Sequence, residues 1–344
     1  MSTGKIRVLI VDDSLFMRTA IKKTLAREPR FEVVGLARDG QQGVDMAIEL
    51  KPDLITMDFN MPGLNGAQAV REIMTKRPTP IIMFSAHTTE GARETFEALA
   101  AGAIDFVTKP SGEVSATLAG AADELLAKGL AAAGAKPQAL APAPKVKTSL
   151  AALTSTWPPS GPRVVLIGVS TGGPAALSRV IPALPGSIRF GIIIVQHMPA
   201  KFTAALAERL DGLSTVKVRE AKTGDKPSAG LVLIAPGNKH VEIAEGGTIQ
   251  LTDGRPVNGC RPSADVTMKS AARVFGRRAV GVVMTGMGKD GAAGLAAIKE
   301  VDGKTIAQDQ ATSVIFGMPK AAIDAGVVDK IVALDDIPSA LEKI

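Results

Sequence analysis

The chain has 344 residues, 46% of them hydrophobic, which is enough for about two compact domains. Its formal net charge of +6 would suit a nucleic-acid partner, but aromatic residues make up only 3% and no recognition-helix motif is present, so we expect no nucleic-acid binding. The single cysteine excludes an intrachain disulfide and fits a reducing cytoplasm, and we expect no signal peptide and no direct membrane insertion because every apolar run is short.

Four short apolar runs in the first half of the chain each end in polar residues. These runs, at 5–13, 54–63, 80–86 and 102–110, predict strands that end at Asp12 and Asp13, at Asp58, at Ser85 and near Lys109. Three carboxylates at strand ends form an oxygen-rich site suited to Mg²⁺. Asp58 is the candidate phosphoryl acceptor, because carboxylates form acyl-phosphate intermediates. Lys109 would neutralise the phosphoryl group, and Ser85 would donate a hydrogen bond to it.

A change in composition divides the chain in two. The stretch 131–160 is rich in alanine and proline and has little periodicity, which is typical of a flexible or extended linker. We therefore expect a first domain over 1–127, a linker over 128–161 and a second domain over 162–344. Lysines in this linker supply half of the net charge, which favours a solvated tether over a DNA-binding arm.

An apolar run at 164–174, VVLIGVSTGGP, leads into a glycine-rich turn that carries Ser170. It matches the nucleophile-elbow pattern G-x-S-x-G, in which a sharp strand-to-helix turn exposes the serine hydroxyl. A serine that only caps the next helix would give the same pattern. The motif therefore predicts a nucleophile only if a base and an acid join it.

The chain has three histidines as candidate bases. His197 follows the apolar run FGIIIVQ, so it is predicted at the carboxyl end of a strand, where open α/β sheets bind ligands. His87 reads as a solvated loop residue. His240 precedes a strand and reads as a polar loop residue, with a smaller chance of being the base.

Asp290 follows a third apolar run, in VGVVMTGMGKDG (280–291), and is the candidate acid that orients His197. A helix-capping role would explain the same aspartate. This segment also spells G-x-G-x-x-G, with Asp309 about 20 residues further on, as in dinucleotide-binding proteins. A carboxylate inside that loop would repel a pyrophosphate, so a nucleotide-binding oxidoreductase remains the lesser alternative.

The stretch 5–127 resembles a response-regulator receiver domain, through VDDS, the DFNMPG element at Asp58, Ser85 and TKP at 108–110. The resemblance implies a flavodoxin-like α/β fold and phosphorylation of Asp58 by a chemotaxis histidine kinase. Phe106 stands where many receivers have tyrosine, so a hydroxyl-dependent switch contact is in question. The expected switch residues are Ser85, Phe106 and Lys109, and the expected Mg²⁺ ligands are Asp12, Asp13, Asp58 and Asn60.

The stretch 162–344 resembles the catalytic domain of the chemotaxis protein-glutamate methylesterases, the CheB family. The resemblance rests on IGVSTGGP, VQHMPAKFTAALAERL, APGNKHVEI, CRPSADV and MTGMGKDGAAGL, which occur in this order. It implies a Rossmann-like, mostly parallel α/β domain with the triad Ser170, His197 and Asp290. The implied reaction is hydrolysis of glutamate methyl esters on methyl-accepting chemotaxis receptors, with methanol released and no cofactor required. Deamidation of receptor glutamine through the same acyl-enzyme is implied as well.

The oxyanion of such a reaction needs backbone N–H donors, and the candidates are those near Thr171 and Met287. Cys260 could act as a nucleophile, but no histidine lies near it in the sequence. The resemblance instead assigns its loop to the substrate cleft. A transcriptional regulator would explain only the first half of the chain, and an oxidoreductase would explain only one loop.

Overall fold

The computed structural model describes residues 4–86, 88–109, 118–135 and 163–343. The chain divides into two compact units, Met1–Ala141 and Pro142–Ile344, which are described separately below. Helix α5 runs over Leu118–Ala132, into the first residues of the predicted linker. The remainder of that linker, from 136 to 161, lies outside the described residues.

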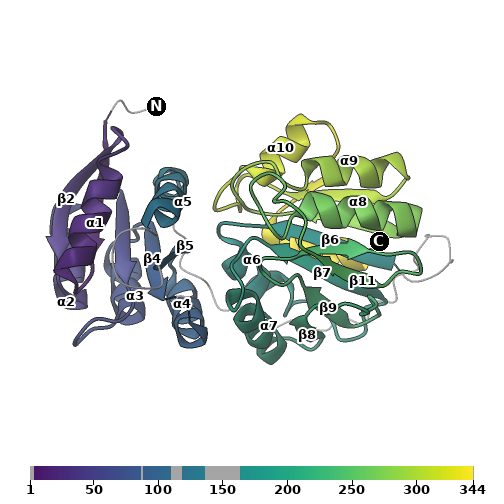
Figure 1. Cartoon of the computed structure of the whole chain (residues 1–344), viewed down its shortest axis with the longest axis horizontal. Coiled ribbons are helices and arrows are strands. Elements are labelled where there is room, and N and C mark those ends of the chain that lie inside the picture. Colours follow the sequence, from purple (N-terminus) through teal and green to yellow (C-terminus); the bar gives the residue numbers. More distant parts are fainter. Residues whose placement is uncertain (1–3, 87, 110–117, 136–162, 344) are drawn as a thin grey trace. The chain divides into compact units, whose positions relative to one another are not determined.

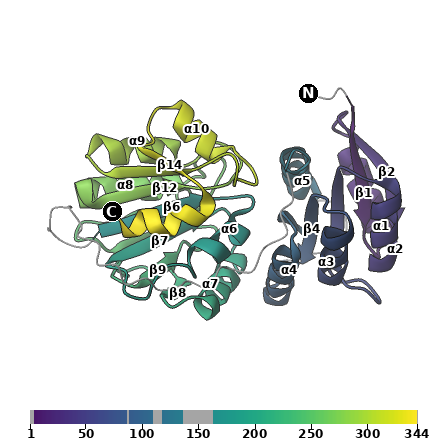
Figure 2. The ribbon, with the colours of Figure 1, turned by 180° about the vertical axis from the view of Figure 1, so that it is seen from behind.

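The first unit is a parallel sheet with strand order β2-β1-β3-β4-β5. Its strands are β1 (Ile6–Val11), β2 (Phe31–Ala37), β3 (Leu54–Asp58), β4 (Ile81–Ala86) and β5 (Asp105–Lys109). Its helices are α1 (Leu15–Leu25), α2 (Gly40–Leu50), α3 (Gly66–Lys76), α4 (Thr89–Ala101) and α5. Helix α1 packs beside α5. Helix α3 packs between α2 and α4, as Figure 2 shows. This is the flavodoxin-like doubly wound fold that was predicted.

The second unit contains a parallel sheet of seven strands in the order β14-β13-β12-β6-β7-β9-β8. Its strands are β6 (Arg163–Val169), β7 (Phe190–Gln196), β8 (Lys217–Glu220), β9 (Leu231–Ile234), β12 (Ala279–Val283), β13 (Lys304–Gln308) and β14 (Lys330–Val332). A separate antiparallel hairpin joins β10 (His240–Ile243) and β11 (Ile249–Thr252). The predicted Rossmann-like, mostly parallel architecture is confirmed.

Helices cover both faces of this second sheet. They are α6 (Gly173–Val180), α7 (Phe202–Leu213), α8 (Ala264–Phe275), α9 (Ala292–Glu300), α10 (Met318–Asp324) and α11 (Ile337–Glu342). Figures 1 and 2 both place α8, α9 and α10 on one face and α6 and α7 on the other. Because both faces are covered, the central strands are apolar along their length, and β7 is buried at every position. None of the helices in the described part of the chain is both long and apolar enough to cross a membrane.

Strand order determines where a site can form in this unit. Strand β6 lies between β7 and β12. After β6 the chain first adds strands on the β7 side of β6 and later adds strands on its β12 side. The carboxyl ends of β6, β7 and β12 therefore meet at a topological switch point, where open α/β sheets bind ligands. Ser170, His197 and Asp290 all follow these three strands.

Candidate functional site

Ser170 lies in the tight turn between β6 and α6. The N–H of Gly173 donates to the Ser170 carbonyl at 2.7 Å, which closes the turn. Gly172 caps α6 with φ +78°, a conformation that glycine adopts without steric cost. Opposite the turn, a Cβ on Gly286 would lie 2.7 Å from the Ser170 Cβ. Only a glycine at 286 therefore leaves room for the serine side chain.

His197 follows the neighbouring strand. Register pairs Val169 of β6 with Gln196 of β7, so Ser170 and His197 leave adjacent strands at the same level. The His197 ring lies 2.8 Å from Asp290 through Nε2 and 3.6 Å from the Cys260 sulfur through Nδ1. Among the described residues, these are the hydrogen bonds of the ring, and none joins it to the Ser170 hydroxyl. The nitrogen left for a nucleophile is thus Nδ1, which faces a thiol in this structure.

Asp290 is buried and surrounded by donors. Its Oδ2 accepts hydrogen bonds from His197 Nε2 and, at 2.6 Å, from the backbone N–H of Ala264. Its Oδ1 accepts from the Ser263 hydroxyl at 2.7 Å and from the Asn258 amide at 3.0 Å. A carboxylate with this many donors is held as the anion in one orientation, as a residue that orients an imidazole must be.

The His197–Asp290 pair stabilises opposite charges on its two members. Burial opposes charge on His197, but its hydrogen bonds to Asp290 and Cys260 outweigh that effect and raise its pKa to about 9. Burial likewise opposes charge on Asp290, but the His197 ring and the surrounding donors lower its pKa to about 2. The pair therefore favours the charged form of the imidazole, and His197 can act as a base only from its neutral form.

Sequence reasoning missed the residues that surround this pair. Cys260 was set aside because no histidine lies near it in the chain, yet it contacts His197 across 63 residues. Asn258, Ser263 and the buried Asp265 join it from the same segment. The signal was present as the run NGCRPSAD (258–265), which leads into the first turn of α8.

The oxyanion candidates lie beside the nucleophile. Thr171 is buried and follows Ser170 directly, while Met287 is partly exposed and follows Gly286, which lies against the Ser170 side chain. Both candidates therefore flank Ser170, one on the β6 turn and one on the β12 loop.

The other two histidines are not part of this cluster as described. His240 is the first residue of β10 and is buried, with Nε2 3.0 Å from the Arg255 carbonyl, so the interpretation as a polar loop residue was wrong. His240 is buried because the β10–β11 hairpin, which it begins, packs against α8. His87 lies outside the described residues.

The dinucleotide-binding alternative is wrong because the backbone N–H groups of the glycine-rich loop already bind a carboxylate of the protein. The N–H groups of Gly291 and Gly294, at the start of α9, donate to the Asp265 carboxylate at 2.9 and 2.7 Å. A pyrophosphate would need these same groups. Asp309, the expected ribose ligand, instead accepts a hydrogen bond from the Thr312 N–H at 2.9 Å and closes its own loop.

The first unit contains a second cluster, at the carboxyl ends of β1, β3 and β5. Ligand atoms of Asp12, Asp13 and Asp58 all lie within 4.8 Å of one another. Lys109 Nζ is 2.8 Å from Asp58 and 3.4 Å from Asp12. Asp12 Oδ2, the oxygen that faces Lys109, is buried and accepts no hydrogen bond from the part of the chain that the structure describes. This donor set fits a hard divalent cation such as Mg²⁺.

The charges of this cluster are incompletely compensated. Burial, and more weakly the neighbouring Asp58, raise the pKa of Asp12 to about 6, although Lys109 opposes the shift. Burial also raises the pKa of Asp58 against the same lysine. The pKa of Lys109 is raised because the two carboxylates outweigh its burial. A single lysine does not balance these acids, so the cluster retains affinity for further positive charge.

The remaining predicted receiver residues lie around this cluster with other partners. The Ser85 hydroxyl donates to the Gly91 carbonyl at 2.9 Å and lies 2.6 Å from the Thr95 hydroxyl. Phe106 is buried, with Lys128 Nζ 5.1 Å from its ring centroid. The Asn60 side chain donates to Glu94 at 3.1 Å. Among the described residues, no hydrogen bond joins the Ser85 or Asn60 side chain to Asp58.

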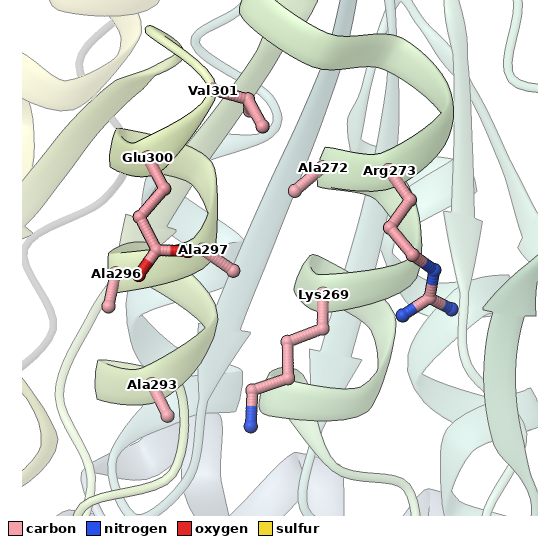
Figure 3. A pocket seen from close by; sticks show the side chains of 8 residues that line it. All are labelled: Lys269, Ala272, Arg273, Ala293, Ala296, Ala297, Glu300 and Val301. Atoms are coloured by element: carbon pink, nitrogen blue, oxygen red, sulfur yellow. The ribbon is translucent and has the colours of Figure 1, made fainter.

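A groove between α8 and α9 has a volume of about 500 Å³. Figure 3 shows Lys269 and Arg273 on one side and Glu300 on the other, with alanines between them. Ser170, His197 and Asp290 do not line it. The groove is therefore separate from the cluster at the switch point.

We expect the raised pKa of His197 to be measurable and to depend on Cys260. In an NMR titration of the histidine ring protons, His197 should titrate near pH 9, well above the usual value of about 6.5. Cys260→Ala should lower this pKa, because it removes the contact at Nδ1. The signal of His240, which does not contact Cys260, serves as the internal control. An unchanged His197 titration in the variant would show that the thiol contact has no energetic weight.

Comparisons with known proteins identify the family to which each half of the chain is similar. The model of the CheB methylesterase family matches residues 165–341, and that of the response regulator receiver domain matches residues 8–118. A relative from Symbiobacterium thermophilum, named protein-glutamate methylesterase/protein-glutamine glutaminase, is 47% identical over 349 aligned residues that cover 98% of this chain and 96% of the relative. A relative of the same name from Thermotoga maritima is 45% identical, with 99% of each chain covered.

A solved structure is similar to the second unit. The crystal structure of the Thermotoga maritima CheB methylesterase catalytic domain matches with a TM-score of 0.52 and 40% identity, over 54% of this chain and 99% of that one. The chain belongs to the CheB methylesterase family, with a response-regulator receiver domain preceding its family domain.

Proposed function

We propose that this chain hydrolyses glutamate methyl esters on chemotaxis receptors and deamidates receptor glutamines, and that phosphorylation of Asp58 regulates both reactions. The observation that carries the proposal is the 2.8 Å contact between His197 and Asp290, directly beside the Ser170 turn. The names of relatives at 45–47% identity over nearly the whole chain support the substrate assignment.

The proposed mechanism begins with Ser170. The neutral form of His197, with its proton on Nε2, accepts the proton of the Ser170 hydroxyl at Nδ1 while the serine oxygen attacks the ester carbonyl. Asp290 stabilises the resulting imidazolium through Nε2. This is the reverse of the serine-protease arrangement, in which the carboxylate holds Nδ1. The chemistry is equivalent, because either ring nitrogen can exchange a proton while the other is held. Before attack, the Ser170 hydroxyl must replace the Cys260 thiol at Nδ1.

The tetrahedral intermediate then collapses. The C–O bond to the methoxy group breaks, and His197 returns the proton so that methanol leaves. Backbone N–H groups near Thr171 and Met287 are suited by position to stabilise the oxyanion. Water, activated by the same imidazole, attacks the acyl-enzyme and releases glutamate. With a glutamine substrate the leaving group is ammonia, and the later steps are the same.

The receiver cluster supplies the proposed control. An Asp58 oxygen attacks the phosphorus of a histidine-kinase phosphodonor, and the bond from phosphorus to the donor breaks. Asp12, Asp13 and Asp58 would hold Mg²⁺, which when bound neutralises charge on the phosphoryl oxygens. Lys109, already 2.8 Å from Asp58, supplies a further positive charge. Phosphorylation adds up to about −2 charge, enough to bias a switch at Ser85 and Phe106.

We expect Ser170→Ala and His197→Ala each to reduce methanol release from methylated receptor membranes by on the order of 10⁴-fold or more, because the two residues act as one unit. Asp290→Asn should be less severe. Ser178→Ala, on the neighbouring helix α6, is the matched control and should retain activity. A folded Ser170→Ala protein with near-normal turnover would exclude the proposed nucleophile.

Asp58→Asn should abolish incorporation of base-labile phosphate from a small-molecule phosphodonor, and removal of Mg²⁺ should do the same to the unaltered protein. The reason is that Asp58 is the acceptor and the acidic cluster holds the cation. Asp45→Asn, on the exposed side of α2, is the control. Undiminished labelling of Asp58→Asn would place the phosphorylation site elsewhere.

The receiver either obstructs the esterase or recruits a partner, and the family resemblance favours obstruction. A tether keeps the two domains at high effective concentration, so even a weak interface stays largely closed. We expect a fragment beginning at Gly161 to hydrolyse receptor esters faster than the unphosphorylated whole chain. A phosphodonor should raise the rate of the whole chain alone. A fragment that is no faster would make the receiver an activator or a docking module.

A further inference from the structure

Asp265 is a buried carboxylate that the proposed mechanism does not use. It lies in the first turn of α8 and is 4% exposed. Its Oδ1 accepts hydrogen bonds from the N–H groups of Gly291 and Gly294, at 2.9 and 2.7 Å, and its Oδ2 accepts from the Asn258 amide at 2.8 Å. Burial of a carboxylate costs free energy unless donors surround it, and these three donors offset that cost for Asp265.

Asp290 makes the converse arrangement. It precedes α9, yet it accepts from the N–H groups of Ala264, at 2.6 Å, and Asp265, at 3.3 Å, at the start of α8. Asp265, which lies in α8, therefore caps α9, and Asp290, which precedes α9, caps α8. Neither helix is capped by the side chain of its own N-cap residue. N–H groups at a helix start stabilise negative charge, so each carboxylate lies where the first turn of a helix favours it.

Asn258 connects the two aspartates. Its Nδ2 donates to Asp265 Oδ2 at 2.8 Å and to Asp290 Oδ1 at 3.0 Å. Its φ of +53° lies in the left-handed region, which asparagine tolerates better than most residues. One amide group thus uses both of its N–H bonds to fix the distance between the carboxylates. Helices α8 and α9, whose starts are joined in this way, lie side by side in Figure 3.

We propose that Asn258 and Asp265 are positioning residues for the esterase reaction, which hold Asp290 at hydrogen-bonding distance from His197. The inference rests on the proposed function. Asp265 anchors the loop that carries Asp290 through Gly291, and Asn258 sets the rotation of the Asp290 carboxylate through Oδ1. Loss of either contact lets Asp290 move away from the imidazole, and a displacement of about 1 Å in a catalytic group costs on the order of 10²-fold in rate.

Two variants of the full-length protein test the proposal. Asn258→Gly removes the bridging amide and accepts the left-handed backbone. Asp265→Asn keeps the side-chain shape but replaces one carboxylate oxygen by an NH₂ group. Both oxygens accept from donors, so in either orientation this group opposes the Asn258 amide or the N–H groups of Gly291 and Gly294. Both should lower kcat for methyl ester hydrolysis about 10- to 100-fold with little change in KM. Asp302→Gly, an exposed residue with φ +59° at the far end of α9, is the control for the backbone change.

A readout without substrate separates positioning from a merely structural role. In both variants the NMR titration of His197 should move from near pH 9 toward the ordinary histidine value, because the Asp290 contact weakens. The double variant should be little worse than either single one, since both act through Asp290. If the folded variants keep kcat within about twofold and leave the His197 titration unchanged, the proposal is wrong. If the His197 titration moves in the variants but the unaltered protein has no esterase activity, the proposed function is refuted instead.

Discussion

The burial of the Asp290 carboxylate is the constraint around which the catalytic half of the chain is arranged. A carboxylate removed from water must recover its hydrogen bonds from the protein. Here five donors supply them, from His197, Asn258, Ser263 and the backbone at the start of α8. Removal of one partner from such a buried pair costs about 3–5 kcal/mol, because an uncompensated charge remains. The loop before α8, the loop after β12 and the end of β7 are thus bound to one another by a single side chain.

The receiver cluster also buries carboxylates, but their charge is compensated in a different way. Asp12 and Asp58 are buried together, and among the described residues Lys109 is the cation that pairs with them. Burial raises the pKa of both carboxyl groups. At the esterase site, donors lower the pKa of Asp290. The difference matches the two proposed roles. A residue that orients a base needs a permanent, satisfied charge, whereas a phosphoryl acceptor needs a site that still attracts a cation.

Both units place their polar residues at the carboxyl edge of a parallel sheet, and this repetition follows from the topology. In a doubly wound sheet, the loops after neighbouring strands diverge at the switch point and leave side chains facing one another. The same edge explains why a glycine-rich loop there resembles a dinucleotide fingerprint. Its N–H groups do bind an anion, but the anion is the protein's own Asp265. The motif correctly indicated an anion-binding loop, but the anion is a carboxylate of the protein and not a pyrophosphate.

Much of this arrangement could be predicted from local pattern. Short apolar runs ending in polar residues located the strands of both sheets, and the ends of three such runs named Ser170, His197 and Asp290 as neighbours. Periodicity and burial act over a few residues, so a single sequence reveals them. The relative order of the strands was accessible only through the family resemblance, because pairing joins segments far apart in the chain.

The tertiary structure alone decided which nitrogen of His197 faces Asp290, what occupies the other nitrogen, and how Asp290 is held. Cys260 lies 63 residues from His197 in the chain, and Asp265 lies 26 residues from Gly291. No local pattern records such contacts, since they depend on how α8 and α9 are set against the sheet. Local sequence patterns were sufficient to identify the chemical groups and the strand ends that carry them. Packing determined their distances and hydrogen-bond partners, because a donor and an acceptor become partners only when the fold brings them within about 3 Å.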